Sequence, residues 1–202
     1  DSAHARGWIA PPGAVSPQAF AGVFRAALAA GFTGADAAML ASIPGATPQG
    51  LPAGTSLPRL SWGEAPRFVT RAAGSPRSLG LYGLVDSAAR MREALDAGLR
   101  TVQLRLKTPA QPDARWPDRL RGEIAACVAL AREAGAELFI NDHWREAAAL
   151  GAPGVHLGQE DLLAMDEPSR SALVASGIGL GISSHSLWEL CRARALAPRY
   201  IA

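Results

Sequence analysis

Four short apolar runs, each ending in polar or charged residues, constrain the fold of this chain more than any other feature of its sequence. They occupy residues 102–107, 138–142, 154–161 and 180–185. A short apolar run between helical stretches indicates a buried parallel strand. When buried strands end in amides, carboxylates and cations, the chemistry lies at their C-terminal edge. The sequence therefore predicts an α/β protein with a functional site at that edge.

A strand–helix alternation begins at Leu79 and continues to the end of the sequence. The predicted strands are 79–85, 101–106, 137–141, 155–157, 179–183 and a start at 199–202, and the predicted helices are 87–98, 119–133, 144–150, 167–176 and 187–196. Such repeating units require parallel strands joined by right-handed crossovers. An open doubly wound sheet and a (β/α)8 TIM barrel both satisfy this pattern.

The position of the polar residues decides between these two architectures. No G-x-G-x-x-G turn follows the first strand, which weighs against a dinucleotide-binding fold. Polar residues at the ends of several successive strands favour the barrel. A barrel needs eight strands, and only six strand starts are present, so the predicted barrel is incomplete and its C-terminal quarter is expected to be missing.

The sequence before the barrel divides into two parts. Residues 1–43 are predicted to be a helical segment, with Ser16 as the cap of a first helix and a second helix over 34–43. Residues 44–78 contain six prolines and several glycines, which predicts a linker. The partial barrel is assigned to 79–202.

Composition excludes several classes of function. A net charge of +2 is too small to indicate a nucleic-acid partner. No apolar run approaches the roughly 20 residues that span a membrane, and the start of the sequence has no secretory signal. Cys127 and Cys191 have neither metal-ligand nor redox spacing and are predicted to be reduced core thiols. We expect a cytoplasmic protein without a membrane or nucleic-acid partner, and a homo-oligomer is left open.

Gln103, Arg105 and Lys107 alternate along one predicted strand, so their side chains are expected to share one face. Two cations beside an amide suit the oxygens of a phosphate together with a hydrogen-bonding ligand. The alternative is a strand end whose cations pair with neighbouring carboxylates. We favour the anion site.

Asp142 and Asp161 each follow a strand-like run, and Asn141 precedes the first of them. Asp142 alone would be read as the cap of the helix that follows it. Two carboxylates from two strands, however, suit one Mg²⁺ ion that completes its shell with phosphate oxygens and water. The pair is therefore predicted to hold a metal–pyrophosphate.

The histidines and Ser183 allow a weaker set of interpretations. His156 is predicted to be a core histidine, and His143 to be exposed. His185 follows Ser183 closely, but a hydrolase would need a nucleophile elbow of the G-x-S-x-G kind, which is absent. Ser183 is instead predicted to donate a hydrogen bond to a ligand.

Taken together, these runs resemble the thiamine-phosphate synthase family over residues 79–202. The matching motifs are L-Y-G-L-V-D at 81–86, Q-L-R-x-K at 103–107, I-N-D at 140–142, G-V-H-L-G-Q-E-D at 154–161, L-G-I-S-x-H at 180–185 and Y-I-A at 200–202. The family is a (β/α)8 barrel that joins hydroxymethylpyrimidine pyrophosphate to a thiazole phosphate and releases pyrophosphate. The resemblance implies a transferase of thiamine biosynthesis that uses Mg²⁺ and reacts dissociatively.

The resemblance also assigns roles to individual residues. It implies that Gln103, Asn141 and Ser183 hold the aminopyrimidine, that Arg105 and Lys107 bind the pyrophosphate, and that Asp142 and Asp161 are the Mg²⁺ ligands. Arg105, Lys107 and Ser183 are the residues it places in the catalytic machinery.

The sequence departs from the family at both ends. The family continues after Y-I-A with a G-P-x-F-x-T-x-T-K loop and two further strands, so the activity of the 202-residue chain is an open question. Residues 16–43 weakly resemble the last helices of the hydroxymethylpyrimidine-phosphate kinase family, but that family's G-x-G-C/D turn is absent and no kinase activity is predicted. The alternative functions are a non-catalytic binding or regulatory barrel, or an inactive fragment of the synthase.

Overall fold

The computed structural model describes residues 7–60 and 78–202, which form two compact units. The second unit, whose described residues are 78–183 and 198–202, contains a parallel sheet of six strands. These strands are β3 (Tyr82–Val85), β4 (Thr101–Leu104), β5 (Glu137–Asn141), β6 (Gly154–Leu157), β7 (Gly179–Ile182) and β8 (Tyr200–Ile201). Each strand pairs with the next one in the sequence, so the sheet order is β3-β4-β5-β6-β7-β8.

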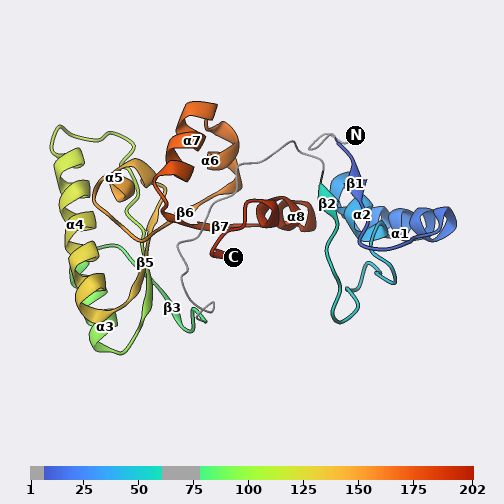
Figure 1. The fold of residues 1–202 in the computed structure, drawn as a ribbon, viewed down its shortest axis with the longest axis horizontal. Coiled ribbons are helices and arrows are strands. Elements are labelled where there is room, and N and C mark those ends of the chain that lie inside the picture. The colour runs from blue at the N-terminus through green and yellow to red at the C-terminus, as the bar shows by residue number, and fades with distance from the viewer. Residues whose placement is uncertain (1–6, 61–77) are drawn as a thin grey trace. The chain divides into compact units, whose positions relative to one another are not determined.

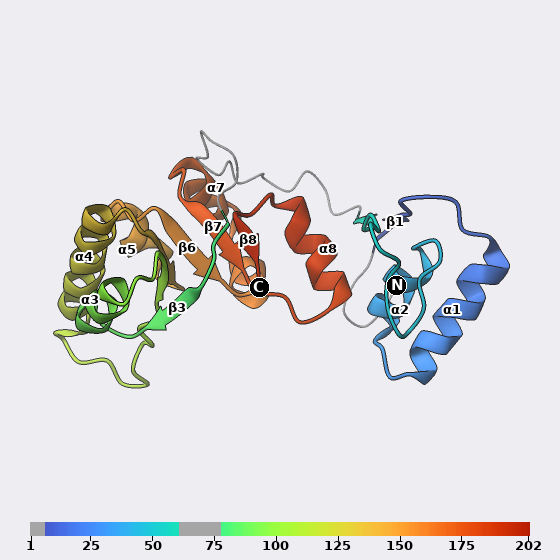
Figure 2. The ribbon, with the colours of Figure 1, turned by 90° about the horizontal axis from the view of Figure 1, so that it is seen from below.

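This strand order distinguishes a barrel from a doubly wound sheet, in which the order reverses at a switch point. The two edge strands also approach each other. Tyr82 on β3 and Tyr200 on β8 have ring centroids 5.4 Å apart, whereas five strand spacings across a flat sheet would span about 24 Å. The sheet is therefore strongly curled (Figures 1 and 2). Because the two rings meet, they lie on its concave face. The prediction of an incomplete (β/α)8 barrel is confirmed.

The helices of this unit lie against the opposite, convex face of the sheet. They are α3 (Ala88–Asp96), α4 (Trp116–Ala134), α5 (Trp144–Ala149), α6 (Gln159–Ala164) and α7 (Glu167–Ala175). We call the alternate residues of β4, β5, β6 and β7 on this side the outer face. Each is at most 1% exposed, and they are Val102, Leu104, Leu138, Ile140, Val155, Leu157, Leu180 and Ile182. Their burial under the helices supplies the main hydrophobic core of the unit.

Local sequence explains where these helices begin and end. Ser87 caps α3 and Asp166 caps α7, in each case by accepting a hydrogen bond from a backbone amide three residues later. Gly135 ends α4 in the left-handed conformation with φ 60°, which glycine adopts without steric cost.

The first unit comprises the described residues 7–60 and 184–197. It contains α1 (Pro17–Ala29), α2 (Gly34–Ala41), α8 (Leu187–Ala195) and an antiparallel pair of short strands, β1 (Ile9–Ala10) and β2 (Arg59–Leu60). The predicted cap at Ser16 is confirmed, and Thr33 caps α2 in the same way. The buried Asp36 carboxylate on α2 accepts a hydrogen bond of 2.8 Å from the backbone amide of Trp188, in the first turn of α8.

Several predicted boundaries differ from the structure. Helix α6 was not predicted, because its six residues are too few for a helical period to show. Strand β4 ends at Leu104 rather than 106, and α4 begins at Trp116 rather than 119. The part of the predicted linker over 61–77 lies outside the described residues. Among the described residues, no helix is both long and apolar enough to span a membrane.

Candidate functional site

The concave face of the sheet carries polar side chains where the outer face carries aliphatic ones. We call this side the inner face; its strand residues include Tyr82, Thr101, Gln103, Glu137, Phe139, Asn141, Gly154, His156, Gly181 and Tyr200. Gln103 and Asn141, which the sequence predicted as substrate ligands, are only 4% and 7% exposed. Ser183 directly follows β7, so these three predicted residues lie on one wall of the half-barrel.

The inner face also contains a hydrogen-bonded group that sequence reasoning missed. His156 contacts Tyr200 Oη through Nδ1 at 2.7 Å and Ser183 Oγ through Nε2 at 2.8 Å. Tyr82 Oη bonds to Tyr200 Oη and accepts a 3.1 Å bond from Gln103 Nε2. The alternating pattern of the strands could have placed His156 on this face, but nothing local to Tyr82 or Tyr200 indicated their contact.

Burial keeps these groups uncharged. It raises the pKa of both Tyr82 and Tyr200 above the usual range of tyrosine. It also lowers the pKa of His156, with a smaller contribution from the positive charge of Arg105. This hydrogen-bonded group is therefore a set of neutral donors and acceptors, which suits a neutral, polar ring rather than an ion.

The Ser–His arrangement on this wall differs from a hydrolase triad. Ser183 Oγ contacts His156, whereas the imidazole of His185 lies 3.3 Å from the carboxylate of Glu189. The orienting partner of His156 is the hydroxyl of Tyr200 rather than a carboxylate.

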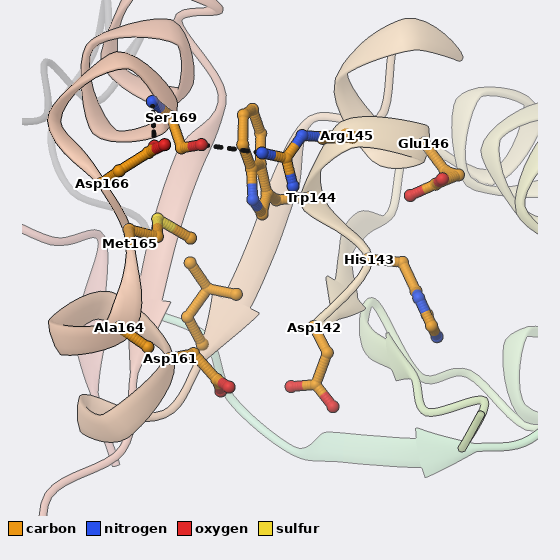
Figure 3. A pocket seen from close by; sticks show the side chains of 11 residues that line it. Asp142, His143, Trp144, Arg145, Glu146, Asp161, Ala164, Met165, Asp166 and Ser169 are labelled. Atoms are coloured by element: carbon orange, nitrogen blue, oxygen red, sulfur yellow. Dashed lines mark hydrogen bonds between the residues drawn. The ribbon is translucent and has the colours of Figure 1, made fainter. Parts of the chain in front are cut away.

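Asp142 and Asp161 lie on the wall of a pocket of about 500 Å³ at the C-terminal edge of the sheet. Figure 3 shows their carboxylates turned toward the same space. Burial and the negative charge of Asp161 raise the pKa of Asp142, while His143, Arg105 and Asn141 oppose this shift. A carboxylate whose ionisation is disfavoured by a second carboxylate nearby belongs to an arrangement that a cation would stabilise.

The backbone positions these two carboxylates by different means. Asp142 follows β5 directly and has a left-handed conformation with φ 64°, and its amide donates to the carbonyl of His156 at 3.0 Å. Asp161 was expected at a strand end, but it lies in the first turn of α6, where its carboxylate accepts a 3.1 Å bond from the amide of Gly158. The correction follows from the unpredicted helix, which begins two residues after β6.

The acidic pair fits Mg²⁺ in one of its usual modes. The described residues contain no cluster of three or more His, Cys, Asp or Glu side chains that could enclose a metal ion. Mg²⁺ is commonly held by one or two carboxylates and completed by substrate phosphates and water. Asp142 and Asp161 are suited to that partial shell.

Arg105 and Lys107 lie beyond the end of β4, on a loop rather than on the strand. Both side chains are exposed, and neither forms an ion pair within the described ranges 7–60 and 78–202. Arg105 is close enough to act on the pKa values of Asp142 and His156. The structure does not bring Lys107 into contact with the other predicted site residues.

His143, predicted to be exposed, is partly buried, and its Nε2 lies 2.9 Å from the carbonyl of Leu106, on the loop that contains Arg105 and Lys107.

Several known proteins are similar to this chain over the region that contains the six-stranded sheet. The family model for thiamine monophosphate synthase matches residues 82–202. A thiamine-phosphate synthase from Neisseria meningitidis serogroup A is 48% identical over 124 residues, which cover 61% of this chain and 56% of the relative. Another from Serratia proteamaculans is 46% identical over 128 residues, covering 63% of this chain and 56% of the relative.

A solved structure is also similar to this chain. Thiamine phosphate pyrophosphorylase from Pyrococcus furiosus has a TM-score of 0.52 and 28% sequence identity, over 61% of this chain and 59% of the other. The chain spans about half the length of the curated relatives it matches.

Proposed function

The chain belongs to the thiamine monophosphate synthase family, and from this premise we propose that its sheet edge joins hydroxymethylpyrimidine pyrophosphate to a thiazole phosphate. The products are thiamine phosphate and pyrophosphate. The observation that carries the proposal is the pair of carboxylates facing one space beside Arg105, next to a buried wall of neutral polar groups. A metal–pyrophosphate group and an attached aminopyrimidine require these two environments side by side.

The pyrimidine is assigned to the inner face. Gln103, Asn141 and Ser183 offer amide and hydroxyl groups that hold a heteroaromatic ring by its edge. Because Gln103 and Asn141 are buried, their hydrogen bonds form away from competing water and fix the ring's orientation. Orientation is what this reaction needs most, since the thiazole nitrogen must approach the exocyclic carbon of the pyrimidine.

The pyrophosphate is assigned to the loops at the strand ends. Asp142 and Asp161 would hold Mg²⁺, which when bound neutralises charge on the departing pyrophosphate. Arg105 and Lys107 add positive charge on the same leaving group. Loss of pyrophosphate before attack by the thiazole nitrogen requires little proton transfer, in keeping with neutral His156 and tyrosine side chains on the inner wall.

We also propose the remaining organisation predicted from the sequence. The synthase unit begins near residue 79, a Pro- and Gly-rich linker occupies 44–78, and the protein works in the cytoplasm. Limited proteolysis provides a test, because a linker should be cut within 44–78 before any site in 119–202 is cut. Cleavage inside 119–202 while 44–78 stays intact would contradict the division.

The metal assignment is tested most directly by Asp161→Asn. The amide oxygen still accepts the bond from the Gly158 amide, so the first turn of α6 keeps its cap while the charge is lost. We expect Mg²⁺-dependent binding of inorganic pyrophosphate, measured by calorimetry, to weaken at least about tenfold, because one of two anionic ligands is removed. Turnover measured as thiamine phosphate formation should fall with it.

Asp166→Asn is the matched control. Asp166 lines the same pocket and caps α7 through the amide of Ser169, but it is not one of the proposed ligands. Its variant should bind Mg²⁺ and pyrophosphate as the wild type does. Equal losses in both variants would contradict the assignment, and binding of pyrimidine pyrophosphate without turnover by the 202-residue chain would favour a non-catalytic barrel or an inactive fragment.

A further inference from the structure

His143 contacts both ends of the loop that joins β4 to α4. Its Nε2 lies 2.9 Å from the carbonyl of Leu106, near the start of the loop. Because a carbonyl oxygen can only accept, Nε2 is the donor in this hydrogen bond. The imidazole also meets the ring of Trp116, the first residue of α4, edge-on with centroids 6.4 Å apart. One side chain therefore joins the beginning of the loop to the helix that follows it.

The part of the loop that carries Lys107 has little other support. The Arg105 amide donates to the carbonyl of Val85 at 2.7 Å, which extends the pairing of β3 and β4 by one residue. Within the described ranges, the bond from His143 is the one hydrogen bond that residues 106–112 form. The backbone at Lys107 therefore depends on His143, whereas the backbone at Arg105 is held by the sheet.

The far end of the loop is fixed independently of His143. The Asp113 carboxylate accepts a 3.0 Å bond from the amide of Arg115 and a 3.1 Å bond from the guanidinium of Arg119 in α4. That guanidinium also lies over the ring of Trp116, 5.9 Å from its centroid. Trp116 therefore gives His143 a support that belongs to α4 rather than to the loop.

His143 lies beside the acidic pair but is directed at the loop. It follows Asp142 directly, and its ring is turned away from the space between the carboxylates of Asp142 and Asp161 (Figure 3). Both His143 and Arg105 oppose the rise that burial causes in the pKa of Asp142, so both lie near that carboxylate. His143 thus links the acidic side of the pocket to the loop that carries the cations.

We infer that His143 is a positioning residue that orders the loop of Arg105 and Lys107 for an anion held at the acidic pair. The inference rests on the proposed function for the identity of the anion, a pyrophosphate. The peptide group between Leu106 and Lys107 is planar, so a bond to its oxygen fixes the direction in which the chain reaches Lys107. A loop that is ordered before binding loses no further conformational freedom when the anion binds, which strengthens the binding.

The first measurement is the backbone order of the loop in the ligand-free 202-residue chain, obtained from nitrogen-15 NMR relaxation. We expect an order parameter of about 0.8 at Lys107 in the wild type and below about 0.6 in His143→Phe, which keeps an aromatic ring beside Trp116 and loses the donor. His143→Gln should restore the order, because its amide Nε2 can donate to the same carbonyl. Unchanged order at Lys107 in His143→Phe would overturn the inference.

Thr101→Val is the matched control, because it also removes a side-chain donor to the backbone of another segment. The Thr101 hydroxyl donates to the carbonyl of Leu79 at 2.6 Å, at the N-terminal edge of the sheet. This variant should leave the order at Lys107 unchanged. A similar loss of order there would show that general loosening of the unit explains the result, and it would contradict the role of His143.

The second measurement is calorimetric binding of inorganic pyrophosphate in the presence of Mg²⁺. We expect His143→Phe to weaken binding about tenfold, the equivalent of one hydrogen bond, and His143→Gln to restore it. In a Lys107→Met background, His143→Phe should weaken binding less than about threefold, because the cation that it positions is already gone. Equal losses in both backgrounds would show that His143 does not act through Lys107 and would overturn the inference.

The two measurements separate a failure of this inference from a failure of the proposed function. If the wild type does not bind pyrophosphate, the proposed function fails. The order of the ligand-free loop still decides whether His143 positions it.

Discussion

The two faces of the six-stranded sheet are built from alternate residues of the same strands, yet they are stabilised in different ways. The outer face is aliphatic, and its residues are almost fully excluded from solvent beneath the helices. The inner face is polar and aromatic, and its side chains satisfy one another by hydrogen bonds across the curl of the sheet. Stability therefore resides mainly on one face, and the specific chemistry on the other.

This difference has a physical basis. Aliphatic burial is non-directional and tolerates small changes in strand position. A buried hydrogen-bond chain needs each partner at the correct distance, and an unpaired member costs free energy. Substitutions on the two faces should therefore change stability for different physical reasons and by different amounts.

The largest expected effect on stability comes from removing aliphatic volume on the outer face. Ile140 is 1% exposed in the middle of β5, so Ile140→Ala should lower the free energy of unfolding by about 3 kcal/mol. Urea unfolding followed by circular dichroism would measure this. A loss below about 1 kcal/mol would mean that the outer face is not the main core of this unit.

A smaller effect is expected from adding one methyl group to the inner face. The Cβ of Gly181→Ala would meet the ring of Tyr200, which its hydrogen bonds hold in place, so the variant should lose about 2 kcal/mol. Gly122→Ala in α4 is the control, because a Cβ there meets nothing within 4 Å and should add up to about 1 kcal/mol. The same substitution should therefore have opposite signs at the two glycines in thermal unfolding, and equal signs would refute the close packing of the inner wall.

The inner face also contains an ion pair, whose contribution should be smaller again. Arg199 donates two hydrogen bonds to the Glu137 carboxylate, at 2.8 and 3.0 Å, and both side chains are largely buried. Glu137→Gln should cost about 1 kcal/mol. Glu93→Gln, which breaks the exposed Arg90–Glu93 pair, should change stability by less than about 0.5 kcal/mol. Similar losses for both variants in denaturant titrations would show that burial does not distinguish the two pairs.

The smallest effect concerns Asp142 at the edge between the two faces. Because the pKa of Asp142 is raised in the folded protein, its ionisation lowers stability as the pH rises through that value. In the absence of divalent cations, Asp142→Asn should therefore be slightly more stable than the wild type at pH 7. Asparagine also tolerates the left-handed backbone found there, which adds a gain that does not depend on pH.

The pH dependence separates these two contributions. Melting temperatures measured from pH 7 down to below 3.8, the ordinary pKa of aspartate, should show the electrostatic part of the gain disappearing as Asp142 becomes protonated in both states. A gain that is constant with pH would leave only the backbone contribution and would contradict the raised pKa.

Local sequence patterns were sufficient for most of the secondary structure. Strand β5 was predicted with its observed bounds, Glu137–Asn141, because a short apolar run ends there in two polar residues. The caps at Ser16 and Ser87 and the stop at Gly135 depend on residues adjacent in the chain. The sequential strand order followed from the polar residues at the ends of successive strands, which favoured a barrel over a doubly wound sheet.

The details of the candidate site depended on tertiary structure. Asp161 was placed at a strand end by its spacing, whereas a six-residue helix with no detectable period moves it to a helix N-terminus. Arg105 was predicted to lie on a strand, but that strand ends one residue earlier. The loop beyond it contacts the imidazole of His143 through the carbonyl of Leu106. Boundaries of this kind depend on hydrogen bonds to neighbouring segments, which a single stretch of sequence does not specify.

The sequence by itself determined the alternation of strands and helices, the two faces of each strand and the polar residues at the strand ends, because each of these is a property of neighbouring residues. Only the tertiary structure decided that Tyr82 and Tyr200, 118 residues apart, meet on the inner face. Their contact depends on how tightly six strands curl, and that curvature is the sum of twists and packing over the whole unit rather than a property of any one segment.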